Sequence, residues 1–424
     1  MPELIVTKDI DAPGLDTLEV YRQHGGYTAL TRALKELQPD AIVEMVKKSG
    51  LRGRGGAGFA TGLKWSFLAK NDKPRYLCCN ADESEPGTFK DRMLMEKNPH
   101  QLIEGVIITS YACRVSTAFI YVRGELALAG RQIERAIEEA YDAGYIGKDI
   151  LGSGFDLDVI MHRGAGAYIC GEESALMESL EGRRGYPRLK PPFPAVIGLY
   201  GGPTVINNAE TLATLPAIIN NNAEWYASFG TEKSKGTRVF CLSGHVKKPG
   251  NYELPLGTPL RTLIYDEQYG GGILDDKQLK AIIPGGSSTF ILGADKVDTP
   301  LDFEAIAAAG SMLGSGGVIV MHEDTCMVGA VLRMIEFYRD ESCGKCTPCR
   351  EGTYWMTEIL DRVEHGHGKE SDIDLLMDIC DNISGKSFCP LGDAATSPVT
   401  SSIKLFREEY AYHIREGHCM VVNE

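Results

Sequence analysis

The sequence predicts a multidomain chain with an α/β domain over residues 1–235, a small β-rich domain over 236–324 and a helical domain over 325–424. Three observations support this division. Strand-like and helix-like segments alternate through the first half, a hairpin pattern follows Arg238, and nearly all of the last hundred residues have helical spacing. A chain of 424 residues is also too long for one ordinary core.

The α/β prediction rests on four segments of the first half. Residues 28–48 have helical apolar spacing that is interrupted at Pro39, where a second helix is expected to begin. The apolar runs 75–79 and 118–122 are typical of buried strands, and 127–143 is a strongly periodic helix. Their alternation indicates strands and helices that share one sheet.

The middle region changes to a β pattern. Residues 239–244 and 251–254 are short strand-like runs joined by a turn at 246–250, and 258–265 has the pattern of a short helix. We therefore expect a hairpin packed on a helix. The helical third region begins near Thr325.

Composition excludes several classes of protein. The 58 acidic residues outnumber the 44 basic ones, and the net charge of −14 disfavours nucleic acid and anionic membrane surfaces. No apolar run approaches the ~20 residues of a spanning helix, and no secretion signal opens the chain, so we expect a cytoplasmic location without direct membrane insertion. Of the twelve cysteines, scattered ones such as Cys113, Cys241 and Cys326 are expected to be small buried apolar residues.

Three cysteines form a cluster with chemical meaning. Cys343, Cys346 and Cys349 have C-x2-C-x2-C spacing, which lets one short loop offer three thiolates to an iron–sulfur cube. Zinc is the main rival, but zinc sites more often pair two C-x2-C halves or add histidines at matched spacing. The spacing therefore predicts an iron–sulfur cluster and single-electron transfer.

The fourth ligand must come from another part of the chain, because Thr353 occupies the position that a ferredoxin-like run would give to cysteine. Cys389 is the preferred candidate, since it precedes proline in a loop-like segment. Cys380 falls on the apolar face of an expected helix, and Cys419 belongs to the C-terminal tail. Both are less suited than Cys389 to be the fourth ligand.

A glycine-rich loop predicts a ligand site in the first domain. Residues Gly53–Gly58 match G-x-G-x-x-G, but the loop follows a helix where a Rossmann fingerprint follows a strand. The glycines still let the backbone approach a phosphate or a flat ring, and Lys64 offers a matching charge. A second small-residue loop over 163–174 and the amides of 207–208 each precede an expected helix.

Polar side chains follow the strand at 75–79. Asn80, Asp82, Glu83 and Glu85 are expected at its carboxyl end, where open α/β sheets bind ligands. They suit hydrogen bonds to ribose hydroxyls and a ring edge. For this segment taken alone, a solvated turn is an equally good interpretation.

Together these motifs closely resemble the NADH-binding flavoprotein subunit of respiratory NADH:quinone oxidoreductase, complex I. The resemblance runs from about Gly25 to the end of the cysteine region and rests on the segments LRGRGGAGF, CNADESEPGTFKDR, RGAGAYICGEESAL, RLKPPFPA, INNAETL and ESCGKCTPCREG with SFCPL. One departure is Ala60, where the family usually has proline. It affects loop stiffness more than chemistry.

The resemblance implies a Rossmann-like FMN and NADH domain, a ubiquitin-like β-grasp domain and a helical bundle with one 4Fe-4S cluster. FMN would be bound without a covalent link, among Gly53, Arg54, Gly55, Lys64, Asn80, Asp82, Gly171, Glu172, Asn207, Asn208 and Thr211. NADH would meet the rings of Phe59, Phe67 and Phe193, near Tyr168 and Lys190. Gly56, Ala57, Gly58 and Glu83 complete the expected cofactor contacts, Glu85 and Glu173 would position the cofactors, and Cys343, Cys346, Cys349 and Cys389 would hold the cluster.

The resemblance also implies partners: a thioredoxin-like 2Fe-2S subunit and a large multi-cluster subunit, which would hold the chain at the cytoplasmic side of the inner membrane. One alternative is the diaphorase subunit of an NAD-linked hydrogenase or formate dehydrogenase. Such chains often carry fused extensions, whereas this one starts about 25 residues before the first shared segment and ends soon after Cys389, which favours complex I. A second alternative, a non-enzymatic cluster or ligand-binding scaffold, leaves the glycine loops and the acidic strand end unexplained.

Overall fold

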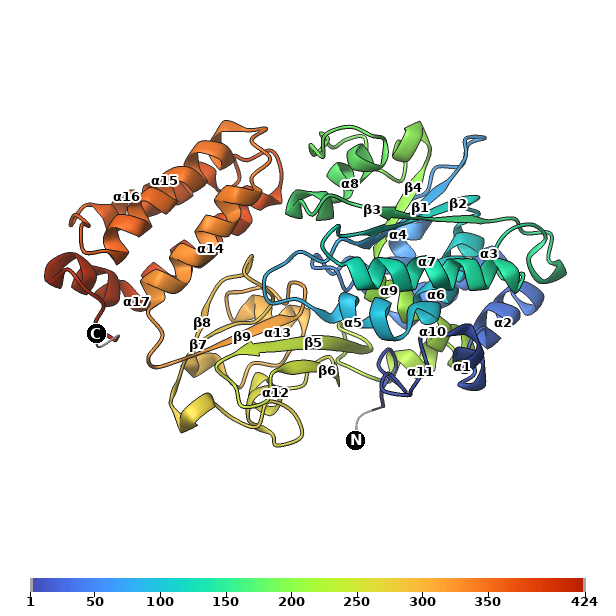
Figure 1. Cartoon of the computed structure of the whole chain (residues 1–424), viewed down its shortest axis with the longest axis horizontal. Coiled ribbons are helices and arrows are strands. Elements are labelled where there is room, and N and C mark those ends of the chain that lie inside the picture. The colour runs from blue at the N-terminus through green and yellow to red at the C-terminus, as the bar shows by residue number, and fades with distance from the viewer. Residues whose placement is uncertain (1–2, 422–424) are drawn as a thin grey trace. The chain divides into compact units, whose positions relative to one another are not determined.

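The computed structural model describes residues 3–421, which fall into two compact units (Figure 1). The first unit holds most of the predicted α/β domain. The second unit joins the predicted middle and C-terminal domains, and the boundary between those two stays a prediction. The first unit runs to Ser84 and continues over 89–240 and 253–258, and the second comprises 85–88, 241–252 and the chain from Pro259 on.

A four-stranded parallel sheet forms the centre of the first unit, in the order β3-β2-β1-β4. Its register places Asn80 of β1 opposite Asn208 of β4. The strands therefore end at the same edge, and both strands expected from apolar runs are confirmed. Their bounds are β1 Tyr76–Ala81, β2 Thr117–Val122, β3 Asp158–Arg163 and β4 Thr204–Asn208.

Helices cover both faces of this sheet. In Figure 1, α6 (Pro99–Cys113), α7 (Ala127–Asp142) and α9 (Ala209–Ala213) lie below it and α8 (Glu173–Leu180) lies above it. Every residue of α6 except Tyr111 is buried, because this helix packs against the sheet on one side and other helices on the other. Central parallel sheets of α/β proteins are enclosed in this way.

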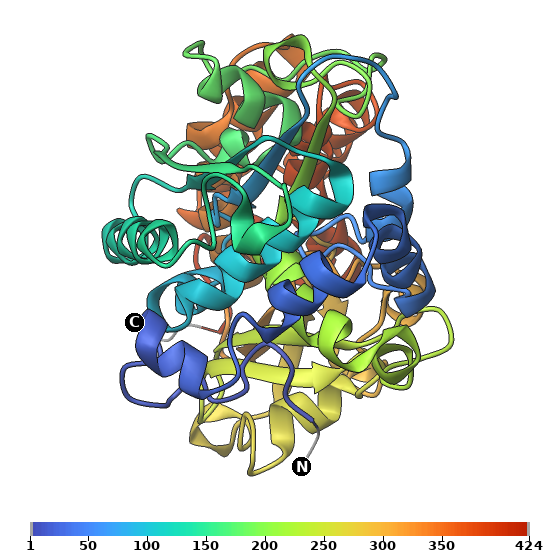
Figure 2. The same ribbon diagram turned by 90° about the vertical axis from the view of Figure 1, so that its right-hand side faces the viewer.

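The remaining helices of the first unit are short. The expected break at Pro39 is confirmed, since proline opens α3 as its first residue, where its missing N–H costs nothing. Figure 2 shows the N-terminal helices (blue) packed on α6 (cyan). The bounds are α1 Leu18–Gln23, α2 Thr28–Glu36, α3 Pro39–Ser49, α4 Thr61–Ser66, α5 Lys90–Lys97, α10 Leu215–Asn221 and α11 Ala223–Ala227.

A buried carboxylate on α6 anchors the N-terminal helices. Glu104 accepts hydrogen bonds from the Tyr21 hydroxyl at 2.5 Å, the Tyr27 backbone N–H at 3.0 Å and the Leu30 backbone N–H at 2.9 Å. Burial raises the pKa of Glu104, although these donors act against the rise. The carboxylate therefore satisfies the orphan N–H groups at the start of α2.

A second sheet is mixed, with five strands in the order β6-β5-β9-β7-β8. Strands β5 and β9 are parallel, whereas β9 and β7 are antiparallel. The expected hairpin of β5 and β6 and the short helix that follows it are present, as in a β-grasp arrangement. The bounds are β5 Thr237–Gly244, β6 Gly250–Pro255, α12 Leu260–Tyr265, β7 Leu279–Ile283, β8 Leu292–Gly293, α13 Phe303–Ala308 and β9 Gly317–His322.

Four helices complete the second unit: α14 (Met327–Glu341), α15 (Thr347–Glu364), α16 (Asp372–Ile383) and α17 (Pro390–Glu416). Helix α14 packs on α15 and α17, and α16 packs on the same two helices, so the four form a bundle (Figure 1). The predicted helical character of this region is confirmed. Among the described residues, no helix combines the length and apolar character needed to cross a membrane.

Replacing the anchoring carboxylate tests this account of the first unit. We expect Glu104→Ala to lower the free energy of unfolding by about 3 kcal/mol, because it leaves two buried N–H groups and a hydroxyl without their acceptor. Urea unfolding followed by circular dichroism measures the change. Glu138→Ala, at an exposed position of α7, is the control and should change little. Equal effects of the two variants would contradict the anchoring role.

Candidate functional site

The carboxyl ends of β1 and β4 bring the predicted polar residues together. The Asn80 side chain donates a hydrogen bond from Nδ2 to the Gly171 carbonyl at 2.8 Å, which ties the second small-residue loop to the sheet edge. The Asn80 Oδ1 accepts from the backbone N–H of Asp82 at 3.1 Å. Asn207 and Asn208 end the neighbouring strand. The edge thus carries amides and a carboxylate where α/β sheets bind ligands.

The glycine-rich loop closes against the same edge. It lies between α3 and α4, and the Gly53 N–H donates to the Phe59 carbonyl at 2.8 Å, which closes the loop. A Cβ at Gly55 would lie 2.9 Å from the Asn208 Cβ, so only glycine allows this close approach. A Cβ at Gly56, where φ is +140°, would meet no atom within 4 Å. The loop is therefore fixed on one side and open on the other.

Arg54 has a structural role in this loop. Its backbone N–H donates to the Thr211 hydroxyl at 2.8 Å. Its guanidinium is fully buried and donates to the Tyr226 hydroxyl and the Thr237 carbonyl, both at 2.8 Å. Arg54 and Thr211 thus brace the loop, and the sequence alone did not distinguish this role from direct contact with a ligand.

Four of the predicted site residues, two lysines and two glutamates, are joined by ion pairs. The Lys190 Nζ lies 2.9 Å from the Glu172 Oε1 and 2.7 Å from the Glu173 Oε1. The Lys64 Nζ lies 3.1 Å from the Glu173 Oε2. Burial acts to raise the pKa of Glu173, but the two ammonium groups outweigh it and hold that pKa below its usual range. Glu173 is therefore ionised at neutral pH.

The other oxygen of Glu172 has a local task. Its Oε2 accepts from the backbone N–H groups of Ser174 at 2.9 Å and Ala175 at 3.0 Å, and so caps the start of α8. The loop before it ends in the short 3-10 turn Tyr168–Gly171. This cap fixes Glu172 and Glu173 beside the sheet edge.

Three predicted aromatic platforms are exposed. Phe59, Phe67 and Phe193 keep 49%, 54% and 58% of their surface accessible to solvent. The rings of Phe59 and Phe67 are 6.2 Å apart between centroids. Neighbouring exposed apolar side chains such as Phe59 and Phe67 often mark a surface that binds a ligand or a partner. They suit the flat rings of a nucleotide.

Buried charges lie beneath the site, and the sequence did not predict them. The Lys90 Nζ lies 2.8 Å from both the Asp91 Oδ1 and the Glu210 Oε2, and all three side chains are buried. Asn208 joins them, since its Nδ2 donates to the Asp91 Oδ2 at 2.6 Å. In the sequence, Lys90 and Asp91 have the pattern of an ordinary solvated helix start. No sequence signal could have found their burial.

Two predicted carboxylates have hydrogen-bonding roles of their own. Glu83 accepts the backbone N–H groups of Asp91 at 2.8 Å and Arg92 at 2.9 Å, which caps α5. Burial and the nearby Asp91 carboxylate raise the pKa of Glu83 to about 7. Glu85 lies in the second unit, where its Oε1 accepts the Ser288 N–H at 2.7 Å. Its predicted part in positioning cofactors stays a prediction.

The cysteine loop and the segment before α17 meet in the helical bundle. Cys346 precedes α15, Cys349 lies in its first turn, and Cys389 precedes α17. The backbone N–H of Phe388 donates to the Cys346 Sγ at 3.4 Å, which brings the residue next to Cys389 onto the cysteine loop. Burial and the neighbouring thiols raise the pKa of Cys349 to about 11, against a hydrogen bond from Ser342.

The rival candidates for the fourth ligand lie elsewhere. Cys380 is buried on α16, where its Sγ lies 3.5 Å from the Met356 sulfur, and burial raises its pKa to about 12. Its expected place on an apolar helix face is confirmed. Cys419 lies beside Cys326 and His413. Cys326 is therefore not the simple buried apolar residue that the sequence suggested.

Comparison with protein families defines the class. The family model described as "Nuo51 FMN-binding domain" matches residues 46–217, and "NADH-ubiquinone oxidoreductase-F iron-sulfur binding region" matches 329–413. An "SLBB domain" model matches 239–291. These regions coincide with the parallel sheet and its loops, the helical bundle and the second sheet. The chain is thus a flavoprotein of the iron–sulfur oxidoreductase class.

Relatives identify the family. The chain is 53% identical over 420 residues to an F-type subunit of the NADH-quinone oxidoreductase of Rhizobium meliloti, covering 99% of both chains. It is 56% identical over 423 residues to the F-type subunit of Mycobacterium tuberculosis, covering 98% of this chain and 94% of that one. It is 57% identical to the F-type subunit of Streptomyces coelicolor, covering 95% and 89%. The chain belongs to the family of F-type subunits of NADH-quinone oxidoreductase.

A solved structure has the same fold. A chain of an NAD+-reducing [NiFe]-hydrogenase in the H2-reduced state matches with a TM-score of 0.84 and 35% sequence identity. The match covers 96% of this chain and 66% of the hydrogenase chain. Hydrogenase and quinone oxidoreductase subunits therefore share this architecture.

The buried charges beneath the site give a second prediction. We expect Lys90→Met to lower the free energy of unfolding by about 3–5 kcal/mol, because it leaves the Asp91 and Glu210 carboxylates buried without their cation. Arg92→Met is the matched control on the same helix. Arg92 is exposed and pairs with the half-buried Glu96 at 3.6 Å, so the loss of this pair should cost under about 1 kcal/mol. Urea unfolding of both variants measures the two losses in the free energy of unfolding. Similar losses would contradict a buried, structural ion pair.

Proposed function

We propose that the sheet-edge site of the first unit binds FMN and NADH and that Cys343, Cys346, Cys349 and Cys389 hold a 4Fe-4S cluster. The chain is an NADH dehydrogenase flavoprotein subunit, as its family membership over nearly its full length indicates. The observation that carries the site assignment is the convergence of the open glycine loop, the strand-end amides and the exposed rings of Phe59 and Phe67 within one unit.

The residues of the first unit fit a flavin nucleotide. Gly55 and Gly56 let the loop backbone approach a phosphate or ring without a Cβ in the way. Lys64 supplies a cation for the phosphate, and Asn80 and Asp82 supply polar groups for the ribityl hydroxyls and the ring edge. The rings of Phe59 and Phe67 suit a nucleotide stacked on the open side.

The four thiols fit an iron–sulfur cluster. They come from a loop and from the residue before α17, and the Phe388 contact to Cys346 holds the two segments together. Cys346 and Cys389 each precede a helix, and Cys349 lies in a first turn, so helix dipoles favour the anionic cluster. An all-cysteine donor set is what such clusters use.

The chemistry divides between the cofactors and the chain. The glycine loop and strand-end residues would hold FMN, which when bound would supply acceptance of the two-electron hydride of NADH and release of single electrons toward the cluster. The chain's residues bind and orient: the glycine loop and strand-end amides fix the ring, and the aromatic side chains hold the nicotinamide nucleotide. Glu173, ionised between Lys64 and Lys190, limits how strongly these lysines attract an anionic ligand. No side chain needs to act as an acid or a base.

The chain is one subunit of a larger enzyme, as the name of its family indicates. We propose that its electrons leave through a thioredoxin-like 2Fe-2S subunit and a large multi-cluster subunit toward quinone. Such partners would hold it at the cytoplasmic side of the inner membrane. The alternative is a diaphorase subunit, and the fold match to the hydrogenase chain is compatible with it. The 53% identity to a quinone oxidoreductase subunit, which extends over nearly the full length of both chains, favours the role in NADH:quinone oxidoreductase.

Reconstitution tests the function. The full chain, treated anaerobically with FMN, iron and sulfide, should show flavin absorbance and reduce ferricyanide with NADH. A chain that stays colourless would contradict the proposal. Lys64→Met should weaken FMN binding roughly tenfold or more, since it removes a charge-assisted contact to the phosphate. Lys70→Met, at an exposed position beyond α4, is the control and should bind FMN normally.

Single cysteine variants test the cluster ligands. Cys389→Ser should lose most of the iron and sulfide, whereas Cys380→Ser should retain both, because Cys380 packs against Met356 inside the bundle. Iron analysis and electron paramagnetic resonance of the reduced protein measure the outcome. Loss of the cluster in the Cys380 variant with retention in the Cys389 variant would overturn the ligand set.

A further inference from the structure

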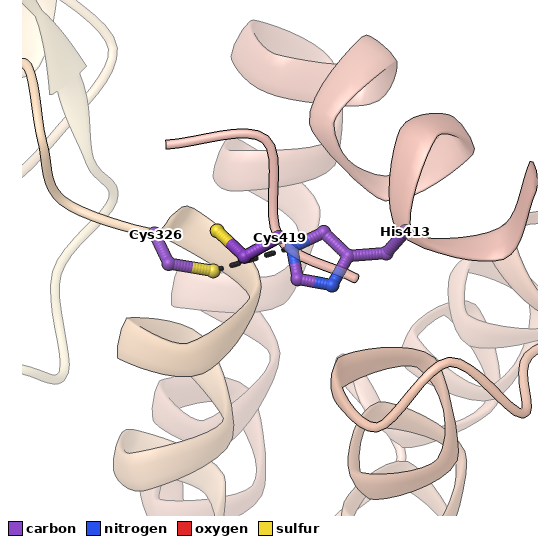
Figure 3. A group of neighbouring side chains, drawn as sticks. All are labelled: Cys326, His413 and Cys419. Carbon is purple, nitrogen blue, oxygen red and sulfur yellow. Dashed lines mark hydrogen bonds between the residues drawn. The ribbon is translucent and has the colours of Figure 1, made fainter. Parts of the chain in front are cut away.

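A second group of metal-type donors lies in the helical bundle. The sulfurs of Cys326 and Cys419 and one ring nitrogen of His413 all lie within 4.8 Å of one another. Figure 3 shows the three side chains turned toward one point. The Cys326 Sγ lies 3.4 Å from the His413 Nε2. The cofactor chemistry proposed above uses none of these residues.

His413 is oriented as a metal-ligating histidine. Its side chain is fully buried and its Nε2 faces Cys326. Its Nδ1 has no hydrogen-bond partner among the described residues, but the Glu364 Oε2 lies 3.8 Å from it. Metal-bound histidines commonly direct the second ring nitrogen at a carboxylate, which fixes the ring and strengthens the ligand.

The two sulfurs have further contacts. The neutral Cys326 thiol donates to the Glu364 Oε2 at 3.4 Å, and burial together with that carboxylate raises the pKa of Cys326. Cys326 is the residue before α14, and its Sγ accepts the Gly329 N–H at 3.3 Å, so it lies at the positive end of a 15-residue helix. Cys419 follows the end of α17, and the Val421 N–H points to its Sγ at 3.5 Å. Both sulfurs thus accept backbone N–H groups, which would offset part of the cost of losing the thiol protons when a cation binds.

We propose that Cys326, His413 and Cys419 bind one Zn²⁺ ion, with Glu364 orienting His413. Two sulfurs and one imidazole nitrogen are donors that zinc prefers, and hard cations such as Mg²⁺ and Ca²⁺ take oxygen ligands. Binding releases the two thiol protons to solvent. Water completes the tetrahedron.

The site has a structural consequence for the bundle. It ties the end of α17 to the start of α14. The other end of α14 lies just before Cys343. The other end of α17 lies just after Cys389. Since α14 is 15 residues long, about 22 Å separate its ends. The zinc site therefore fixes the end of the bundle remote from the iron–sulfur ligands, and holds 417–421 against α14.

Metal analysis tests the proposal on the full chain with its cluster loaded. After one equivalent of zinc chloride and desalting, the wild type should hold about one zinc and about four iron atoms. Cys326→Ala and Cys419→Ala should lose zinc tenfold or more and keep their iron. Cys380→Ala, which removes a thiol from the same bundle, is the control and should keep both metals. Zinc content that is the same in all four proteins would overturn the site.

Two further results would also overturn it. One is a wild type that retains no zinc, and the other is a disulfide between Cys326 and Cys419, detected by mass spectrometry of alkylated peptides. Competition with a chelating dye then tests the role of Glu364. Glu364→Gln should weaken zinc binding 10- to 100-fold, whereas Glu408→Gln, an exposed carboxylate of α17, should not. Equal affinities would contradict the orientation of His413 by Glu364.

Hydrogen exchange gives a readout independent of metal content. Amides of residues 417–421 should exchange tenfold or more slowly when zinc is present, because the ion holds this segment to α14. Zinc should leave exchange unchanged in Cys419→Ala. Slowing of the same size in the variant would overturn the proposal.

Discussion

The buried ammonium of Lys90 is the interaction on which the ligand-binding edge depends. It lies between the carboxylates of Asp91 on α5 and Glu210 on α9, and Asn208 at the end of β4 bonds to the same group. Burial disfavours the charge, but the two carboxylates raise the pKa of Lys90 further than burial lowers it. A charge network of this kind specifies geometry more than it adds stability. It fixes the strand end against which the glycine loop closes.

The loops above that edge are fixed by groups that do not themselves need to touch a ligand. Arg54 braces the glycine loop through Thr211 and the Tyr226 hydroxyl, and Glu172 caps α8. Glu83 caps α5 in the same way. The ligand-facing groups are thereby held in place before binding, so less conformational entropy is lost when a cofactor binds.

The helical bundle of the second unit has a comparable division. One end of α15 and α17 carries the cysteines expected to hold the iron–sulfur cluster, and the far ends of α14 and α17 meet at Cys326, His413 and Cys419. Cluster ligands on helix starts need helices that keep their relative positions. Helix α17 takes part at both ends, since it begins after Cys389 and carries His413 near its C-terminal end, and it is interrupted at Phe406 between them.

The sequence by itself determined the class of each domain, the cluster spacing and the segments that form the site, because helical and strand periods, glycine loops and C-x2-C spacing are local signals. It identified Cys389 as the fourth ligand candidate and Cys380 as a packed residue. Only the tertiary structure decided that Arg54 braces the loop, that Lys90 is buried and that Cys326 meets Cys419. These depend on contacts between residues far apart in the chain, and local pattern carries no information about such contacts.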